Sequence, residues 1–173
     1  MKNLRFVLLL LLLTPLFFQY SSAQRPSVSK KYSNDEIEKM VQAFKMEYSH
    51  HVMPTELLMQ KFRKDFPGAY DIEWEKAAGL YEVEFEIRGA DYEAYYDEQG
   101  NLIMFKHDTY QSDLPNLIKK QVKAQYPNYR FDDIDRIVKG TNVLYKIEME
   151  RGDMDVRIII KEDGTILNQM TDY

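Results

Sequence analysis

The sequence of 173 residues has no cysteine and only three histidines. A chain without cysteine forms no disulfides, has no thiol nucleophile and cannot carry a lipid on a cysteine. The histidines are His50, His51 and His107, and they lack the spacing of zinc ligands on one helix face. A Gly-x-Ser-x-Gly motif and a glycine-rich phosphate loop are also absent from the sequence. We therefore predict no catalytic site, no metal site and no cofactor.

Long apolar runs are scarce, and the one that is present lies at the N-terminus. Lys2 and Arg5 precede an apolar stretch over 6–18, and small residues follow at 21–23. This order predicts a signal peptide that is cut after Ala23, so that the mature protein is periplasmic or secreted and has no membrane contact. An uncleaved anchor is the alternative, but the interrupted run is shorter than the roughly 20 apolar residues that a spanning helix needs.

The charge of the chain is acidic. The whole sequence has 23 basic and 28 acidic residues and a net charge of −5. Loss of the first 23 residues removes two basic residues and no acidic ones, which leaves a 150-residue mature chain with a net charge of −7. Because nucleic acids and anionic lipids repel such a chain, we expect neither as a partner. The partner expected from the duplicated sheet and its acidic surface is a protein or peptide in the envelope or outside the cell.

One structural unit occurs twice in the mature sequence. In each copy a helical stretch that ends at a proline is followed by alternating strands and a glycine turn. The matched segments are 54–66 and 115–126 for the helices, 81–85 and 145–149 for the strands, and Gly100 and Gly164 for the turns. The sequence predicts an α+β fold of two tandem units, 52–109 and 110–173, each a helix packed on a four-stranded antiparallel sheet whose other face is in water.

Two hairpins set the predicted register. A type II′ turn at Gly89-Ala90 would place Phe85 opposite Ala94. A turn at Gly152-Asp153 would place Met149 opposite Val156. Both choices bring apolar side chains together on one face.

An extra helix over 33–51 is predicted before the first unit. Ser33 and Glu36 have the spacing of a capping box, and an apolar stripe from Ile37 to Tyr48 is expected to pack on the first unit. Residues 24–32 are expected to form a flexible lead-in.

Several motifs of the first copy resemble the PepSY-like family, which is described as β-lactamase-inhibitor-like. They are Phe66-Pro67-Gly68-Ala69, Ile72-Glu73-Trp74-Glu75, Tyr81-Glu82-Val83-Glu84-Phe85 and Asp97-Glu98-Gln99-Gly100. The resemblance implies a secreted or periplasmic protein of tandem α+β units whose sheets form a continuous binding surface. The resemblance does not imply that this protein inhibits an enzyme, because the β-lactamase inhibitors use disulfides and this chain has no cysteine.

The outward face of the first predicted sheet is strongly acidic. In the predicted register Glu86 lies opposite Glu93 and Glu82 lies opposite Asp97, and like charges in these positions destabilise a sheet. Such a surface favours a basic partner or a cation, although acidic faces also occur for solubility alone. The predicted partner-binding residues are Glu73, Glu75, Glu82, Glu84, Glu86, Glu93 and an exposed Tyr95.

Three functional hypotheses follow. The first is a non-catalytic binding module that contacts a protein or peptide through its sheet. The second is a periplasmic protein that binds or buffers cations with the same carboxylates. The third is a hydrolase with paired carboxylates, which the sequence disfavours because glutamates on a wet strand lack the burial that raises the pKa of a general acid. The oligomeric state is left open.

Overall fold

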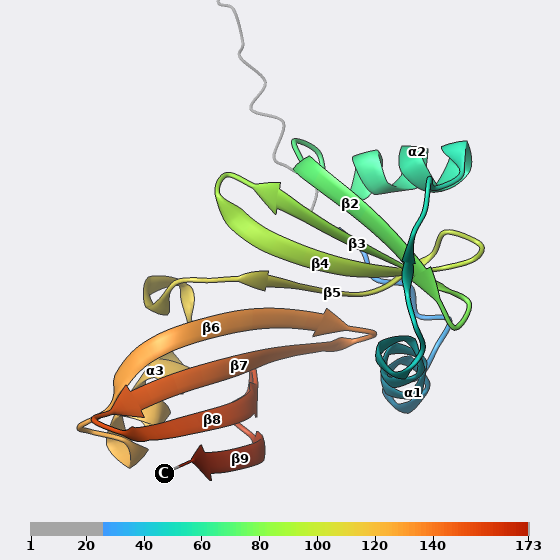
Figure 1. Cartoon of the computed structure of the whole chain (residues 1–173). Helices are drawn as coiled ribbons and strands as arrows, with labels where there is room; N and C mark the ends of the chain where they lie inside the picture. The colour runs from blue at the N-terminus through green and yellow to red at the C-terminus, as the bar shows by residue number, and fades with distance from the viewer. Residues whose placement is uncertain (1–25, 173) are drawn as a thin grey trace, which may run out of the picture.

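The computed structural model describes residues 26–172 (Figure 1). The predicted signal peptide, 1–23, and its cleavage after Ala23 lie outside these residues. No helix within 26–172 is both long and apolar enough to cross a membrane.

Nine strands form one antiparallel sheet in chain order. The strands are β1 His50–His51, β2 Tyr70–Ala77, β3 Leu80–Ile87, β4 Ala90–Asp97, β5 Leu102–Asp108, β6 Arg130–Lys139, β7 Asn142–Arg151, β8 Met154–Lys161 and β9 Ile166–Asp172. The helices are α1 Asn34–Met46, α2 Glu56–Asp65 and α3 Asn116–Gln125, with a short 3-10 helix η1 at Gln111–Asp113. The predicted α+β class is confirmed, but the strands form one sheet instead of the two separate four-stranded sheets that were predicted. β5 and β6 pair with each other, and β1 adds a ninth strand.

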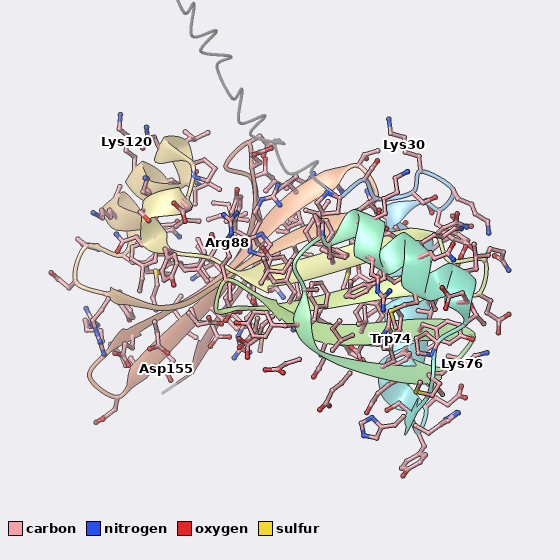
Figure 2. The ribbon with its side chains drawn as sticks, turned by 90° about the horizontal axis from the view of Figure 1, so that it is seen from above. Lys30, Trp74, Lys76, Arg88, Lys120 and Asp155 are labelled. Carbon is pink, nitrogen blue, oxygen red and sulfur yellow. The ribbon has the colours of Figure 1, made fainter. Side chains whose placement is uncertain are left out.

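Helices α2 and α3 bury the apolar stripes of the two halves. Phe62 of α2 is fully buried and packs its ring against Trp74, with 5.3 Å between the ring centroids. Figure 2 shows Trp74 beside α2. In the second half Ile118 of α3 belongs to a cluster with Ile147 and Ile158. The alternating strand residues thus supply one apolar face, and burial of these side chains is worth about 1.5–3 kcal/mol each.

Helix α1 packs on the opposite face of the sheet from α2 (Figure 1). Ile37 and Phe44 meet Leu80 and Tyr95, and the rings of Phe44 and Tyr95 make an edge contact at 5.5 Å. The prediction that this face stays in water is therefore wrong at this end of the sheet. The capping box of Ser33 is confirmed, but α1 ends at Met46 and leaves Tyr48, predicted to lie in the apolar stripe, 90% exposed.

The same helix also reaches the second half of the chain. Glu38 forms an ion pair with Lys139 of β6 at 2.7 Å. The turn after β6 comes so close that a Cβ at Gly140 would lie 2.7 Å from the side-chain oxygen of Asn34, and the φ of Gly140 is +55°. Glycine is favoured there because any other residue would be strained at this φ and would push the Asn34 side chain aside. Helix α1 therefore holds the β5–β6 junction from one side.

The predicted register holds for one hairpin and is wrong for the other. Met149 lies opposite Val156, as predicted. In the first hairpin Phe85 lies opposite Tyr92 instead of Ala94, because the turn is made by Arg88 and Gly89. Their φ values of 56° and 77° fit a type I′ turn, whose twist matches that of the strands. The strain of a non-glycine residue at positive φ is thus accepted at Arg88.

Residues 26–32, predicted to be a flexible lead-in, make defined contacts with β4 and β5. The Ser29 amide donates to the Leu102 carbonyl at 2.7 Å. The ammonium of Lys31 and the hydroxyl of Tyr32 bind the carboxylate of Asp97 at 3.0 and 2.9 Å. Asp97, predicted to face water, is only 2% exposed, because this segment covers it.

Asp97 is held ionised by its donors. Burial opposes its ionisation, but hydrogen bonds from the side chain and backbone of Asn101, and from Lys31 and Tyr32, lower the pKa of Asp97 to about 2. The unfolded chain has a value near 3.9, so this carboxylate contributes about 2 kcal/mol at neutral pH.

Replacing Asp97 tests this contribution. Asp97→Asn should lower the free energy of unfolding at pH 7 by about 2 kcal/mol, because the charge that accepts these hydrogen bonds is lost. Because the pKa of Asp97 is lower in the folded state than in the unfolded state, its stabilising contribution is complete above the unfolded-state pKa. The contribution disappears as the pH falls through the folded-state pKa. The difference between wild type and variant in urea unfolding should therefore shrink between about pH 4 and pH 2. A difference independent of pH would contradict this account.

The role of α1 is tested by truncating its central side chain. Ile37→Ala should destabilise the protein by about 3 kcal/mol, since a fully buried side chain leaves a cavity. Met46→Ala at the end of the same helix is the control, because Met46 is 81% exposed and its loss should be nearly neutral. Equal effects of the two substitutions in urea unfolding would show that α1 does not pack as described.

Candidate functional site

The acidic residues predicted from the sequence lie in rows across β2, β3 and β4. Glu84 of β3 lies directly opposite Glu73 of β2 on one side and directly opposite Glu93 of β4 on the other. Glu86 lies opposite Asp91. The predicted pairs Glu86–Glu93 and Glu82–Asp97 are wrong because the hairpin turn is shifted, but like charges still face each other. The inferred electrostatic cost therefore persists with different partners.

Three of these carboxylates converge. Oxygen atoms of Glu82, Glu84 and Glu93 all lie within 4.8 Å of one another. Glu93 is held by the ammonium of Lys106 at 2.7 Å, and Glu82 accepts a hydrogen bond from the Tyr95 hydroxyl. Burial, followed by the charge of Glu93, raises the pKa of Glu84. Burial also raises the pKa of Glu82, against the hydrogen bond from Tyr95.

Tyr95 is not exposed, contrary to the prediction. Its side chain is fully buried between the sheet and Phe44 of α1. Burial, followed by the charge of Glu93 and the hydrogen bond to Glu82, raises the pKa of Tyr95. The hydroxyl is therefore protonated and acts as a fixed donor beneath the carboxylates. Tyr95 can position Glu82 but cannot touch a partner while α1 is in place.

An open groove of about 440 Å³ lies beside this cluster, at the ends of β3 and β4 and along β5. Four predicted residues line it, namely Glu73, Glu84, Glu86 and Glu93, whereas Glu75 and Glu82 do not. The other lining residues are Asp71, Phe85, Asp91, Tyr92, Lys106, His107, Asp108 and Asp135. The groove therefore contains eight carboxylates and one lysine.

The sequence prediction missed the acidic residues that come from β5 and β6. Asp108 and Asp135 lie directly opposite each other because these two strands pair. Nothing in the repeat alone places one copy beside the other, so this pair could not be found from local patterns. Asp91 could have been found, because the shift of the first turn brings it opposite Glu86.

The histidines do not form a metal site in residues 26–172. His107 stacks on Tyr92 with 4.7 Å between the ring centroids, and its Nδ1 lies 2.8 Å from the Asp108 carbonyl oxygen. Burial lowers the pKa of His107, which keeps the ring neutral near pH 7. His50 and His51 form the short edge strand β1, away from the groove lining.

The second half of the same face is balanced in charge. Glu148 lies opposite Arg157 and accepts a hydrogen bond from it at 2.8 Å. Lys146 binds Asp135 at 2.8 Å and Glu148 at 3.1 Å. In the middle of the sheet the excess negative charge therefore lies in the groove and the β2–β4 rows, whereas the far end of the second half has one further acidic pair, Glu150 opposite Asp155.

The chain belongs to the family described as "Putative beta-lactamase-inhibitor-like, PepSY-like". Its sequence profile matches twice, over residues 31–104 and 105–168. The resemblance inferred from the sequence motifs is thus confirmed. No curated protein matches the chain.

Several solved structures share the fold. A BLIP-like protein from Bacteroides fragilis is 20% identical, with a TM-score of 0.59 over 69% of this chain and 87% of the other. A DUF2874 family protein from Bacteroides uniformis is 15% identical, with a TM-score of 0.60 over 69% of this chain and 90% of the other. A protein from Bacteroides eggerthii described as "putative periplasmic" is 15% identical, with a TM-score of 0.61 and the same coverage. At these identities the similarity shows the fold.

Two glutamates on the same face should respond oppositely to neutralisation. Glu84→Gln should raise the free energy of unfolding at pH 7 by about 0.5 kcal/mol, because it removes repulsion from Glu73 and Glu93. Glu148→Gln should lower it by about 0.5 kcal/mol, because it removes the acceptor for Arg157 and Lys146.

The effect of Glu84→Gln should depend on pH. Because the folded pKa of Glu84 is raised, its destabilising charge disappears on acidification, and the advantage of Glu84→Gln should fade as pH drops through that value. Urea unfolding at several pH values measures both effects. Two changes of the same sign at pH 7 would contradict the proposed distribution of charge.

Proposed function

We propose that this protein is a non-catalytic binding module of the periplasm or cell exterior that holds a lysine- or arginine-bearing segment of another protein in the acidic groove. The observation that carries the proposal is the excess of carboxylates in an open hollow on a rigid sheet. Clefts lined by charge of one sign concentrate the opposite charge and accelerate its association.

The groove keeps part of its negative charge uncompensated. Within residues 26–172 no basic side chain forms an ion pair with Glu73, Glu84 or Asp91. The repulsion among these residues costs stability, and a bound ammonium or guanidinium would relieve it.

The setting of this surface supports a binding role over a catalytic one. The groove lining contains no serine, threonine or cysteine. The family description names inhibitor-like proteins, and one structural neighbour is described as periplasmic. A periplasmic or secreted location agrees with the predicted signal peptide. Inhibition of an enzyme is one form that such binding can take.

A second candidate function is cation binding by Glu82, Glu84 and Glu93. The observation in its favour is their convergence within 4.8 Å. Calcium takes six to eight oxygen ligands, and here the Lys106 ammonium already occupies one side of Glu93 at 2.7 Å. Lys106 binds one carboxylate oxygen of Glu93 and leaves the other without a hydrogen-bond partner, so the three residues offer fewer free oxygens than calcium takes. A cationic side chain approaching from the open groove is therefore the better fit. Calorimetric titration with Ca²⁺ or Zn²⁺ distinguishes the two functions, and binding of either ion at micromolar concentration would favour the cation-binding function.

Charge reversal in the groove tests the main proposal. Glu84→Lys combined with Glu86→Lys should weaken binding of a labelled oligolysine peptide at least tenfold, because two attractive contacts become repulsive. The same variant should lose the proteins that wild type captures from an envelope extract. Fluorescence anisotropy gives the affinity for the peptide, and mass spectrometry identifies the captured proteins.

A matched variant separates the groove from net charge. Asp153→Lys combined with Asp155→Lys makes the same change of charge at the β7–β8 end, where Figure 2 labels Asp155. Asp155 lies two strands away from Asp135 and four residues along β8 from Ile159, the residue in line with Asp135. This control should bind oligolysine within about twofold of wild type, since its charges lie beyond a Debye length of about 8 Å from the groove in physiological salt. If both double variants lost the same affinity for oligolysine, net charge alone would explain the binding and the groove would not be the binding site.

A further inference from the structure

The two edges of the sheet are protected to different degrees. At one edge β1 pairs with Lys76 and Glu75, and the rest of β2 carries a bulge between Tyr70 and Glu73. Asp71 within this bulge has a φ of 49°, so its backbone leaves the strand conformation. A short outer strand, a bulge and charged side chains are the features that keep edges from pairing with other chains.

The other edge, β9, lacks most of this protection. No residue from Ile166 to Thr171 is charged, and the strand contains no proline. Leu167 is 50% exposed and Met170 is 48% exposed. A register shift between Ile159 and Ile160 disturbs only the start of the strand. From Leu167 to Thr171, β9 presents an exposed, uncharged edge, and the charged Asp172 ends the strand.

The internal repeat shows which kind of neighbour a strand in the position of β9 can pair with. β9 is β5 moved by 64 residues, since Leu102–Asp108 becomes Ile166–Asp172, and the register shift after Tyr95 recurs after Ile159. The outer side of β5 is occupied by β6 as an antiparallel strand. The equivalent side of β9 has no partner strand in residues 26–172. The vacant position therefore has the geometry of a strand acceptor.

The repeat also identifies the free backbone groups. The Thr109 amide donates to the Ile134 carbonyl at 2.8 Å, which marks Thr109 as a hydrogen-bonded position toward β6. Alternate residues of an antiparallel strand bond to the same neighbour, so Phe105 and His107 also point their amides toward β6. Their equivalents in β9 are Gln169 and Thr171. These two residues direct their backbone N–H and C=O groups outward.

We propose that β9 pairs antiparallel with β9 of a second copy of this chain, through the backbone of Gln169 and Thr171. An antiparallel pair of identical strands is self-complementary about a two-fold axis. The uncharged edge allows acidic copies to approach without direct repulsion, and pairing covers Leu167 and Met170. A head-to-tail arrangement is blocked because the opposite edge is closed by β1 and by its bulge.

This pairing is independent of the groove. The groove lies on β2–β6, and β7 and β8 separate it from β9. The dimer would therefore contain one continuous sheet with a groove in each half. Failure of one proposal leaves the other intact, because their surfaces share no residue.

A proline at Gln169 tests the backbone pairing. The amide of Gln169 points away from β8, so Gln169→Pro removes the outward donor while the ladder to β8 persists. Sedimentation velocity over a range of micromolar concentrations should show a dimer for wild type and for the control Gln169→Ala, and a monomer for Gln169→Pro. Circular dichroism checks that each variant is folded.

Complementary charges give a second test that tolerates a failure of the proline variant to fold. Gln169→Lys alone and Gln169→Glu alone should each be monomeric, because like charges face each other across the two-fold axis. An equimolar mixture of the two should form a heterodimer. Gln60→Lys on the exposed side of α2 is the matched control and should dimerise like wild type. A wild-type monomer at all concentrations, or a dimer that neither the proline nor the charges disturb, would overturn the proposal.

Discussion

The pairing of β5 with β6 is the interaction on which the rest of the molecule depends. It turns two copies of one unit into a single nine-stranded sheet. It also brings Asp108 opposite Asp135, which completes the acidic groove with residues from both copies. Helix α1 supports this junction from the face opposite α2, where Glu38 binds Lys139 and Asn34 meets the turn at Gly140. The groove is therefore a product of the duplication, since neither copy contains all of its walls.

The two copies differ in what they do with charge. In the first copy glutamates face glutamates across neighbouring strands, an arrangement that opposes folding. In the second copy the corresponding positions form the pairs Glu148–Arg157 and Lys146–Asp135, which support it. Residues that reduce stability without local compensation are commonly kept for function. This contrast is the physical reason to propose that binding occurs on the first copy and at the junction.

Much of the fold could be predicted because it depends on local patterns. The alternation in β7 and β8 gave the correct pairing of Met149 with Val156, and Ser33 with Glu36 gave the start of α1. The first hairpin was predicted wrongly because Gly89 was placed first in the turn rather than second. The 64-residue repeat would have corrected it, since the pairing of Met149 with Val156 moves back to Phe85 with Tyr92.

The site was harder to predict because it depends on contacts between distant segments. Strand alternation places Tyr95 on the outer face, but it cannot show that α1 covers that face and buries the ring. Local patterns also give no sign that the segment at Lys31 and Tyr32 buries Asp97. Four of the predicted residues line the groove because their strand positions alone decide which way they point. The aspartates of β5 and β6 required the tertiary pairing.

The central claim is that the acidic groove at the junction receives a cationic side chain. The most direct measurement is NMR titration of the isotope-labelled protein with an oligolysine peptide. The account predicts that amide shifts concentrate at residues 84–86, 91–93 and 106–108 and at Asp135, and that they weaken as salt is added. Shifts spread evenly over all acidic residues, or concentrated on the second half of the sheet, would contradict it.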